Sequence, residues 1–440
     1  MQILFSRVKN TIFITVLIEI NKRTCLSSYL LLSCSFVVFA ANFLKETPMS
    51  ISQKMLAFAE HSSWIRRMFE EGARLKAQYG AEQVCDFSLG NPDLPPPPQY
   101  QEALRKVTAA EGPGAHAYMA NNGYLFVREA VARQITAEQG LTVAQDDILM
   151  TVGAAGAINV AMKALLDPGD EVIILAPFFV EYNFYVDNHG GLTKIVNTAA
   201  DFSLDLAAIE AALTPKTKAI IINSPNNPTG QIYASAELAA LAEILRKAPQ
   251  TIYLISDEPY RKIVYDGHTV PSVFAAYSNA VIVSSYSKDL SLPGERIGYL
   301  VVHPQIEGKA QLVGAMTLAN RILGFVNAPA LMQRVVAELQ GVTVDCAVYA
   351  RRRALFCKIL AEAGYEFVPP KGAFYLFPKS PIADDARFVG LLAEQRILGV
   401  PGRGFGMPGY FRLAFCVEDE VINRSASGFK KALAAAKALT

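Results

Sequence analysis

Residues 147–176, "DILMTVGAAGAINVAMKALLDPGDEVIILA", decide the fold. A short apolar run is followed by a turn of small residues, a segment with helical spacing and a second apolar run, which predicts a strand, a helix and another strand. Four more short apolar runs follow downstream: "KAIIIN" (218–223), "IYLISD" (252–257), "AVIVSS" (280–285) and "IGYLVV" (297–302). Such runs alternating with helices predict an α/β fold, with a mostly parallel sheet covered by helices on both faces.

The chain changes character at about residue 325, where long segments with helical spacing begin. They lead into the short runs "GAFYLF" and "YFRLAFC", and this order predicts a second, smaller α/β domain. The predicted divisions of the chain are an atypical apolar extension (1–48), an N-terminal arm with part of the small domain (49–92), a large domain (93–325) and the C-terminal part of the small domain (326–440).

The first 48 residues differ from the rest of the chain. The stretch 29–44, "YLLLSCSFVVFAANFL", is apolar but has only 16 residues, whereas a membrane-spanning helix needs about 20. Three interpretations stay open: an over-extended start with Met49 as the true first residue, a signal or anchor segment, and an organelle-targeting segment. We expect a cytoplasmic protein, or a membrane-anchored or exported one if this segment is genuine.

Composition excludes several classes of partner. The 41 basic and 40 acidic residues give a net charge of +1, so no charge excess points to nucleic acid or to an anionic membrane surface. The six cysteines include no CxxC pair, which argues against a disulfide framework. The five histidines are scattered without ligand spacing, so no metal site is predicted.

Polar residues follow the predicted strands at their carboxyl ends, where ligands bind in such folds. "NSPNNPTG" carries Asn227, "SDEPY" carries Asp257 and Tyr260, and "SYSK" carries Lys288. A carboxylate after an apolar strand needs a donor or a cation, and a lysine there can act as a nucleophile toward carbonyls. Taken singly, each motif has a plainer explanation, namely a β-turn, a helix cap or a solvated lysine.

The small-residue turn "GAAG" (153–156) precedes a helix, whose free backbone N–H groups can bind a phosphate, although it also suits close packing of a helix on a sheet. Together these residues match one cofactor. Pyridoxal phosphate needs a lysine for its aldehyde, a carboxylate for its ring nitrogen, donors for its phenolic oxygen and a phosphate site.

From about Met49 onward the chain resembles the class I, fold-type I pyridoxal-phosphate aminotransferases of the aspartate-aminotransferase-like superfamily. The resemblance rests on "NSPNNPTG", "SDEPY", "SYSKDLSLPGERIGY" and "KGAFYLF", in the family's order and spacing. It implies a seven-stranded sheet between helices, and ping-pong transfer of an amino group from an L-amino acid to a 2-oxo acid. The alternatives are a lyase of the same fold that catalyses C–S β-elimination, another amino acid enzyme with this cofactor, such as one that catalyses ring-forming γ-elimination, and a non-catalytic regulator.

The resemblance also implies a role for each matching residue. Lys288 forms the aldimine with the cofactor and shuttles the proton, while Asp257 keeps the ring nitrogen protonated. Asn227 and Tyr260 bond the phenolic oxygen, with Tyr260 also counted among the catalytic residues and Asn227 among those near the substrate. The phosphate is held by residues from two segments: the backbone N–H groups of Ala154 and Ala155, together with Ser285, Ser287 and Arg296.

Four further residues are assigned by the same resemblance. Phe179 stacks on the cofactor ring, Gly90 lies beside the substrate, and Arg412 binds the substrate α-carboxylate through a bidentate pair. Tyr118 reaches the phosphate of a neighbouring subunit, which implies a homodimer with shared active sites. Side-chain specificity is not predicted. The mere presence of further arginines (Arg321, Arg403) is no evidence, and the aromatic residues near the motifs (Phe178, Tyr182, Phe374, Tyr375) would suit apolar or aromatic donors but could equally belong to the core.

Overall fold

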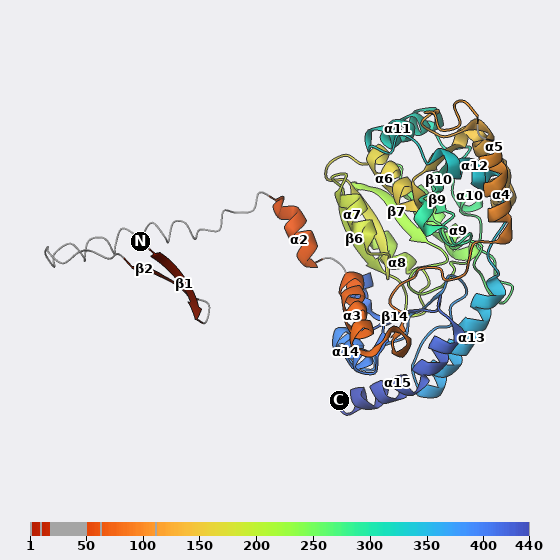
Figure 1. Ribbon diagram of the computed structural model, residues 1–440. Helices are drawn as coiled ribbons and strands as arrows, with labels where there is room; N and C mark the ends of the chain where they lie inside the picture. Colours follow the sequence, from red (N-terminus) through yellow and green to blue (C-terminus); the bar gives the residue numbers. More distant parts are fainter. Residues whose placement is uncertain (1, 9–10, 18–50, 62–63, 111, 440) are drawn as a thin grey trace, which may run out of the picture. The chain divides into compact units, whose positions relative to one another are not determined.

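The computed structural model describes five parts of the chain: 2–8, 11–17, 51–61, 64–110 and 112–439. It divides into two units, Met1–Ser62 and Ser63–Thr440. In the first unit, β1 (Gln2–Val8) pairs antiparallel with β2 (Thr11–Leu17), and α2 (Gln53–His61) is a short helix (Figure 1).

The interpretation of residues 1–48 stays a prediction, because the apolar stretch 29–44 and Met49 lie outside the described residues. Among the helices that the structure describes, none has the length and apolar character to cross a membrane.

A seven-stranded sheet forms the centre of the second unit, with the strand order β4-β10-β9-β8-β7-β5-β6. Its strands are β4 (Ile148–Thr151), β5 (Glu171–Ala176), β6 (Leu192–Asn197), β7 (Thr217–Asn223), β8 (Tyr253–Asp257), β9 (Ala280–Ser285) and β10 (Gly298–Val302). The strand β10 runs antiparallel to both of its neighbours, β4 and β9, whereas the remaining pairs are parallel. The predicted mostly parallel sheet of seven strands is therefore confirmed.

Helices cover both faces of this sheet. Successive side chains of a strand point to opposite faces, so each face has its own apolar cluster. In β4, Ile148 and Met150 belong to one apolar cluster and Leu149 to the other. The cluster around Leu149 includes α6 (Gly153–Leu165), α7 (Glu181–Asp187) and α11 (Lys309–Ile322). The other includes α4 (Pro98–Ala109), α5 (Leu125–Gln139), α8 (Leu206–Ala212), α9 (Ser235–Lys247), α10 (Val273–Ala276) and α12 (Ala330–Ala337).

The remaining α-helices and strands of the second unit contribute to two further apolar clusters. They are α3 (Trp64–Tyr79), α13 (Cys346–Ala363), α14 (Asp385–Glu394), α15 (Asp419–Lys437), a sheet of β11 (Tyr375–Leu376), β14 (Phe411–Ala414) and β13 (Val400–Pro401), and a pair of β3 (Cys85–Asp86) with β12 (Ile397–Leu398). Figure 1 shows α13 and α15 side by side. The pairing of β3 with β12 joins early and late parts of the chain, as predicted, while the domain boundaries stay predictions.

Candidate active site

The carboxyl ends of three neighbouring parallel strands bring polar side chains together. Asn223 at the end of β7 is in register with Asp257 at the end of β8, and Ser285 ends the adjacent β9. A cavity of about 310 Å³ lies at this edge of the sheet, within the range of about 300–1,000 Å³ typical of small-molecule sites. The sheet topology therefore places the predicted residues around one cavity.

Asp257 lies in this cavity with one carboxylate oxygen bonded and one free. The Tyr182 hydroxyl donates to Oδ2 at 2.5 Å, whereas Oδ1 is buried and has no partner among the described residues. Burial raises the Asp257 pKa to about 7, while the bond from Tyr182 lowers it and the neighbouring Glu258 raises it further. A cationic N–H group in the cavity would complete this carboxylate and favour its charged form.

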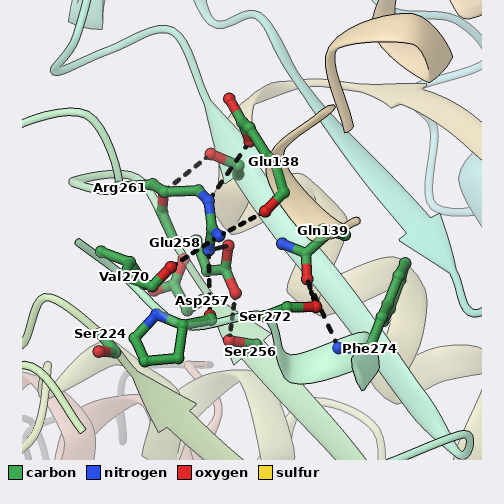
Figure 2. A network of polar contacts seen from close by, with 12 residues as sticks. Glu138, Gln139, Ser224, Ser256, Asp257, Glu258, Arg261, Val270, Ser272 and Phe274 are labelled. Carbon is green, nitrogen blue, oxygen red and sulfur yellow. Dashed lines mark hydrogen bonds and ion pairs between the residues drawn. The ribbon is translucent and has the colours of Figure 1, made fainter. Parts of the chain in front are cut away.

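The neighbouring residue, Glu258, does not line the cavity, and Figure 2 shows its carboxylate beside Ser256 and Arg261. Ser256 Oγ donates to Glu258 Oε1 at 2.7 Å, and Arg261 Nη1 donates to Oε2 at 2.8 Å. Arg261 also lies 3.5 Å from the Glu138 carboxylate and bonds the carbonyl oxygens of Glu138 and Val270. This network fixes the backbone that follows Asp257 without using the cavity.

Lys288 brings an amine into the cavity. Its Nζ atom donates to the Gly90 carbonyl at 2.8 Å and lies 5.5 Å from the centre of the Phe374 ring. The Lys288 pKa is lowered to about 8, chiefly by burial and also by the charges of Arg412 and Arg296, while Cys416 acts in the opposite direction. A larger fraction of this amine is therefore neutral near pH 7 than for a solvated lysine, which suits a nucleophile and a proton acceptor.

At another part of the cavity wall, Arg296 lies beside the N-terminus of α6. It follows the 3₁₀ turn Pro293–Glu295 with a φ of 51°, and its Nη1 donates to the Pro293 carbonyl at 3.0 Å. The helix begins at Gly153, where an added Cβ would come within 2.9 Å of Arg296 Nη2. The free N–H groups of the helix and the guanidinium together make a site for a phosphate.

Arg412 is buried in the cavity wall between the rings of Tyr375 and Phe405, each 4.7 Å from its guanidinium carbon. Its Nη1 donates to Asn227 Oδ1 at 3.1 Å and its Nη2 to the Ser88 carbonyl at 2.6 Å. Its Nε atom is buried without a partner among the described residues. A buried cation with a spare donor is suited to bind a carboxylate.

Gly90 is required by the close approach of Tyr375. A Cβ at this position would lie 1.9 Å from the Tyr375 hydroxyl oxygen, which is itself 2.9 Å from the Tyr260 hydroxyl. Any larger residue would displace this tyrosine pair. The glycine thus lets the backbone carbonyl that accepts from Lys288 lie close to the cavity.

Comparison with known families identifies the chain. The model of the family "Aminotransferase class I and II" matches residues 82–429. The chain belongs to this family. It is 33% identical over 369 residues to an aspartate aminotransferase of Thermotoga maritima, covering 81% of this chain and 93% of that protein. It is 34% identical over 355 residues to an aspartate/prephenate aminotransferase of Thermus thermophilus, covering 79% and 90%.

A solved structure of an aminotransferase from Eubacterium rectale has the same fold. Its TM-score is 0.85 at 37% sequence identity, covering 88% of this chain and 99% of that one. This aminotransferase therefore transfers amino groups with pyridoxal phosphate as its cofactor, and the lyase alternative is not favoured. The site fits this cofactor, because the unpaired Oδ1 of Asp257 suits a protonated ring nitrogen and the start of α6 with Arg296 suits its phosphate.

The cavity wall of the aminotransferase contains all but one of the site residues predicted from the sequence. They are Gly90, Ala154, Ala155, Phe179, Asn227, Asp257, Tyr260, Ser285, Ser287, Lys288, Arg296 and Arg412. Tyr118 is the exception, since it is 90% exposed and does not line the cavity of its own chain. Its predicted role at a neighbouring subunit stays a prediction.

Apart from Phe179, no role was predicted from the sequence for the residues of the segment "FFVEYNFY" (178–185), which follows β5. Tyr182, named only as one of several aromatic residues, donates to Asp257, and Glu181 and Tyr185 also line the cavity. The role of Asn223 was not predicted either. Its side chain donates to the Asp257 carbonyl and accepts from the Asn227 N–H, so it joins the two predicted residues. The available signal was a glutamate and two tyrosines within two helical turns of the predicted ring-stacking Phe179.

Proposed function

We propose that Lys288 is the catalytic lysine of this aminotransferase, and that one cavity serves both half-reactions between an L-amino acid and a 2-oxo acid. One observation carries the proposal. A lysine amine of lowered pKa, a carboxylate with an unpaired oxygen and an arginine beside a helix N-terminus line the same cavity. Three such groups together match three different parts of the cofactor.

When bound, pyridoxal phosphate supplies the aldehyde and the electron-withdrawing ring for this chemistry. Lys288 Nζ accepts the Cα proton of the amino donor, and in the reverse half-reaction it returns a proton to the Cα of the amino acid that forms. This role is supported by its pKa of about 8, since a general base is most effective when its pKa lies near the working pH.

The other cavity residues bind and orient. Asp257 would hold a proton on the ring nitrogen of the cofactor, while Tyr182 keeps the carboxylate in place through Oδ2. Asn227 and Tyr260 would bond the phenolic oxygen. Ser285, Ser287, Arg296 and the backbone N–H groups of Ala154 and Ala155 would hold the phosphate, and Phe179 would stack on the ring; all of these residues line the cavity.

At the substrate end, Arg412 binds the α-carboxylate shared by all amino donors and 2-oxo acceptors. Support comes from its burial between two aromatic rings and from its Nε donor, which has no partner among the described residues. Gly90 keeps the neighbouring space open, and Asn227 orients the guanidinium through Oδ1.

Replacing Lys288 by alanine tests the proposal. We expect Lys288→Ala to retain bound cofactor and to lose amino transfer by about 10⁴-fold or more, because nucleophile and proton carrier are removed together. The assay follows the new amino acid formed from an added 2-oxo acid, with ammonia release measured in parallel to detect elimination. Lys247→Ala, at an exposed lysine, is the matched control. Near-normal turnover of Lys288→Ala would refute the assignment.

We further propose that the aminotransferase is a homodimer, with Tyr118 reaching the phosphate site of the partner subunit. Support comes from the 90% exposure of this tyrosine, which lies away from the cavity of its own chain. Its relatives are members of a family in which homodimers are typical. Sedimentation of the active enzyme tests this, and full turnover by a species of monomer mass would contradict it.

The cytoplasm is the compartment that we propose for the enzyme. The four cysteines that the structure describes (Cys85, Cys346, Cys357, Cys416) are all free thiols, as is usual in a reducing compartment. Cell fractionation with an activity assay tests this placement, and recovery of the activity with membranes or outside the cell would overturn it.

A further inference from the structure

The cavity contains a carboxyl group that the proposed mechanism does not use. Glu181 is the first residue of α7, two positions after Phe179, and its side chain lines the cavity together with Arg412 and Tyr185. Its Oε2 atom is buried and has no hydrogen-bond partner among the described residues. Since an unsatisfied buried acceptor destabilises the fold, this oxygen is suited to a donor that enters with a ligand.

Glu181 lines the same cavity as Arg412, the residue proposed to bind the substrate α-carboxylate. Burial raises the Glu181 pKa, while a bond from its own backbone N–H and the charge of Arg412 lower it. The terminal nitrogens of Arg412 are bonded to Asn227 and Ser88, so this guanidinium leaves Glu181 Oε2 without a hydrogen bond. Glu181 and Arg412 therefore line one cavity without a hydrogen bond from Arg412 to Glu181 Oε2, which leaves this oxygen available for another part of the substrate.

The remaining part of the substrate is its side chain, because the α-carboxylate and the amino group are already assigned to Arg412 and to the site of Lys288. We propose that Glu181 determines side-chain specificity, an inference that rests on the proposed function. Glu181 selects amino donors whose side chain carries an amide N–H and disfavours donors with a second carboxylate. Three cationic side chains line the cavity in the described chain, Lys288, Arg296 and Arg412, and each already has a role. Glu181 therefore presents an acceptor where a dicarboxylate would require a donor or a cation.

Paired acid and amide donors test this inference with the holoenzyme. The half-reaction is followed by the absorbance of the bound cofactor with asparagine, aspartate and alanine. We expect the wild-type enzyme to favour asparagine over aspartate in kcat/KM by about tenfold or more, and Glu181→Gln to lower this ratio by a similar factor. Alanine, which has no polar side chain, serves as the internal control and should react equally with both enzymes.

A binding measurement separates this inference from the proposed function. Succinate and succinamate, which lack an amino group and do not react, are titrated into both holoenzymes. Glu181→Gln should bind succinate about tenfold more tightly than the wild type does. The wild type should bind succinamate more tightly than Glu181→Gln does. If Glu181→Gln does not fold, Glu181→Ser takes its place. Unchanged ratios in both assays, or a wild-type preference for the dicarboxylates, overturn the inference. If no donor reacts at all, the proposed function fails, and the titration still decides the role of Glu181.

Discussion

Asp257 and Glu258 are neighbours in the chain, both are buried, and burial raises the pKa of both, yet their surroundings differ. Both oxygens of Glu258 are bonded within the protein, one by Ser256 and the other by Arg261 (Figure 2). Asp257 lines the cavity; Tyr182 donates to one of its oxygens, and the other is buried without a partner in the described chain.

This difference separates a structural carboxylate from a functional one. A buried acceptor without a donor costs about 1–3 kcal/mol, so the fold has no reason of its own to keep Asp257 Oδ1 unpaired. A ligand that supplies a cationic N–H removes this cost at the moment of binding. Glu258 needs no ligand, because Arg261 and Ser256 already complete it. The same contrast singles out Glu181, whose Oε2 is also unpaired among the described residues.

The largest effect is expected from a substitution in the network around Glu258. Arg261→Met removes the cation between Glu258 and Glu138 and leaves buried carboxylates without it, so we expect a loss of about 3–5 kcal/mol in the free energy of unfolding. Turnover per folded molecule should stay near that of the wild type, since Arg261 does not line the cavity.

Chemical denaturation of the cofactor-saturated enzyme measures this loss. The control is Arg74→Met, which removes an exposed, solvent-screened ion pair to Glu71 and should lower stability far less than Arg261→Met does. Equal losses in the two variants would show that the network around Glu258 does not stabilise the fold more than an exposed ion pair does.

The residues that line the cavity could be predicted from the sequence better than the network around Glu258. Lys288 and Asp257 could be predicted because the period of the apolar runs locates strand ends, and parallel strands present those ends at one edge of the sheet. The bond from Tyr182 to Asp257 spans 75 positions, so no local pattern reports it. The same holds for the contact of Arg261 with Glu138, which is set by the packing of α5 against the sheet. Nor did the apolar run 297–302 reveal that β10 is antiparallel.

A smaller effect is expected from a substitution of Asp257, the carboxylate in the cavity. Asp257→Asn keeps the size of the side chain and an acceptor for Tyr182 but removes the negative charge that holds the ring proton. We expect kcat to fall by about 10²–10³-fold, the range observed when one preorganised electrostatic group is lost. Steady-state kinetics at saturating cofactor measure this. Glu258→Gln is the matched control, expected to lower stability while largely preserving kcat. An equal fall of kcat in both variants would remove the distinction between the two neighbours.

The effect that is smallest per measured step, one pH unit, is the pH dependence of stability in the cofactor-free enzyme. Folding raises the Asp257 pKa from its ordinary value of 3.8 to about 7, so between these pH values the folded chain binds a proton that the unfolded chain has lost. Stability attributable to Asp257 is therefore complete below pH 3.8 and declines as the pH rises to about 7, by up to about 1.4 kcal/mol per pH unit. Asp257→Asn should flatten this decline between pH 5 and 7 in denaturant titrations. Saturating cofactor should also flatten it in the wild type, because the ring N–H favours the ionised carboxylate. Parallel curves for wild type and variant would mean that Asp257 is already ionised in the empty site, and that its free oxygen is satisfied without the cofactor.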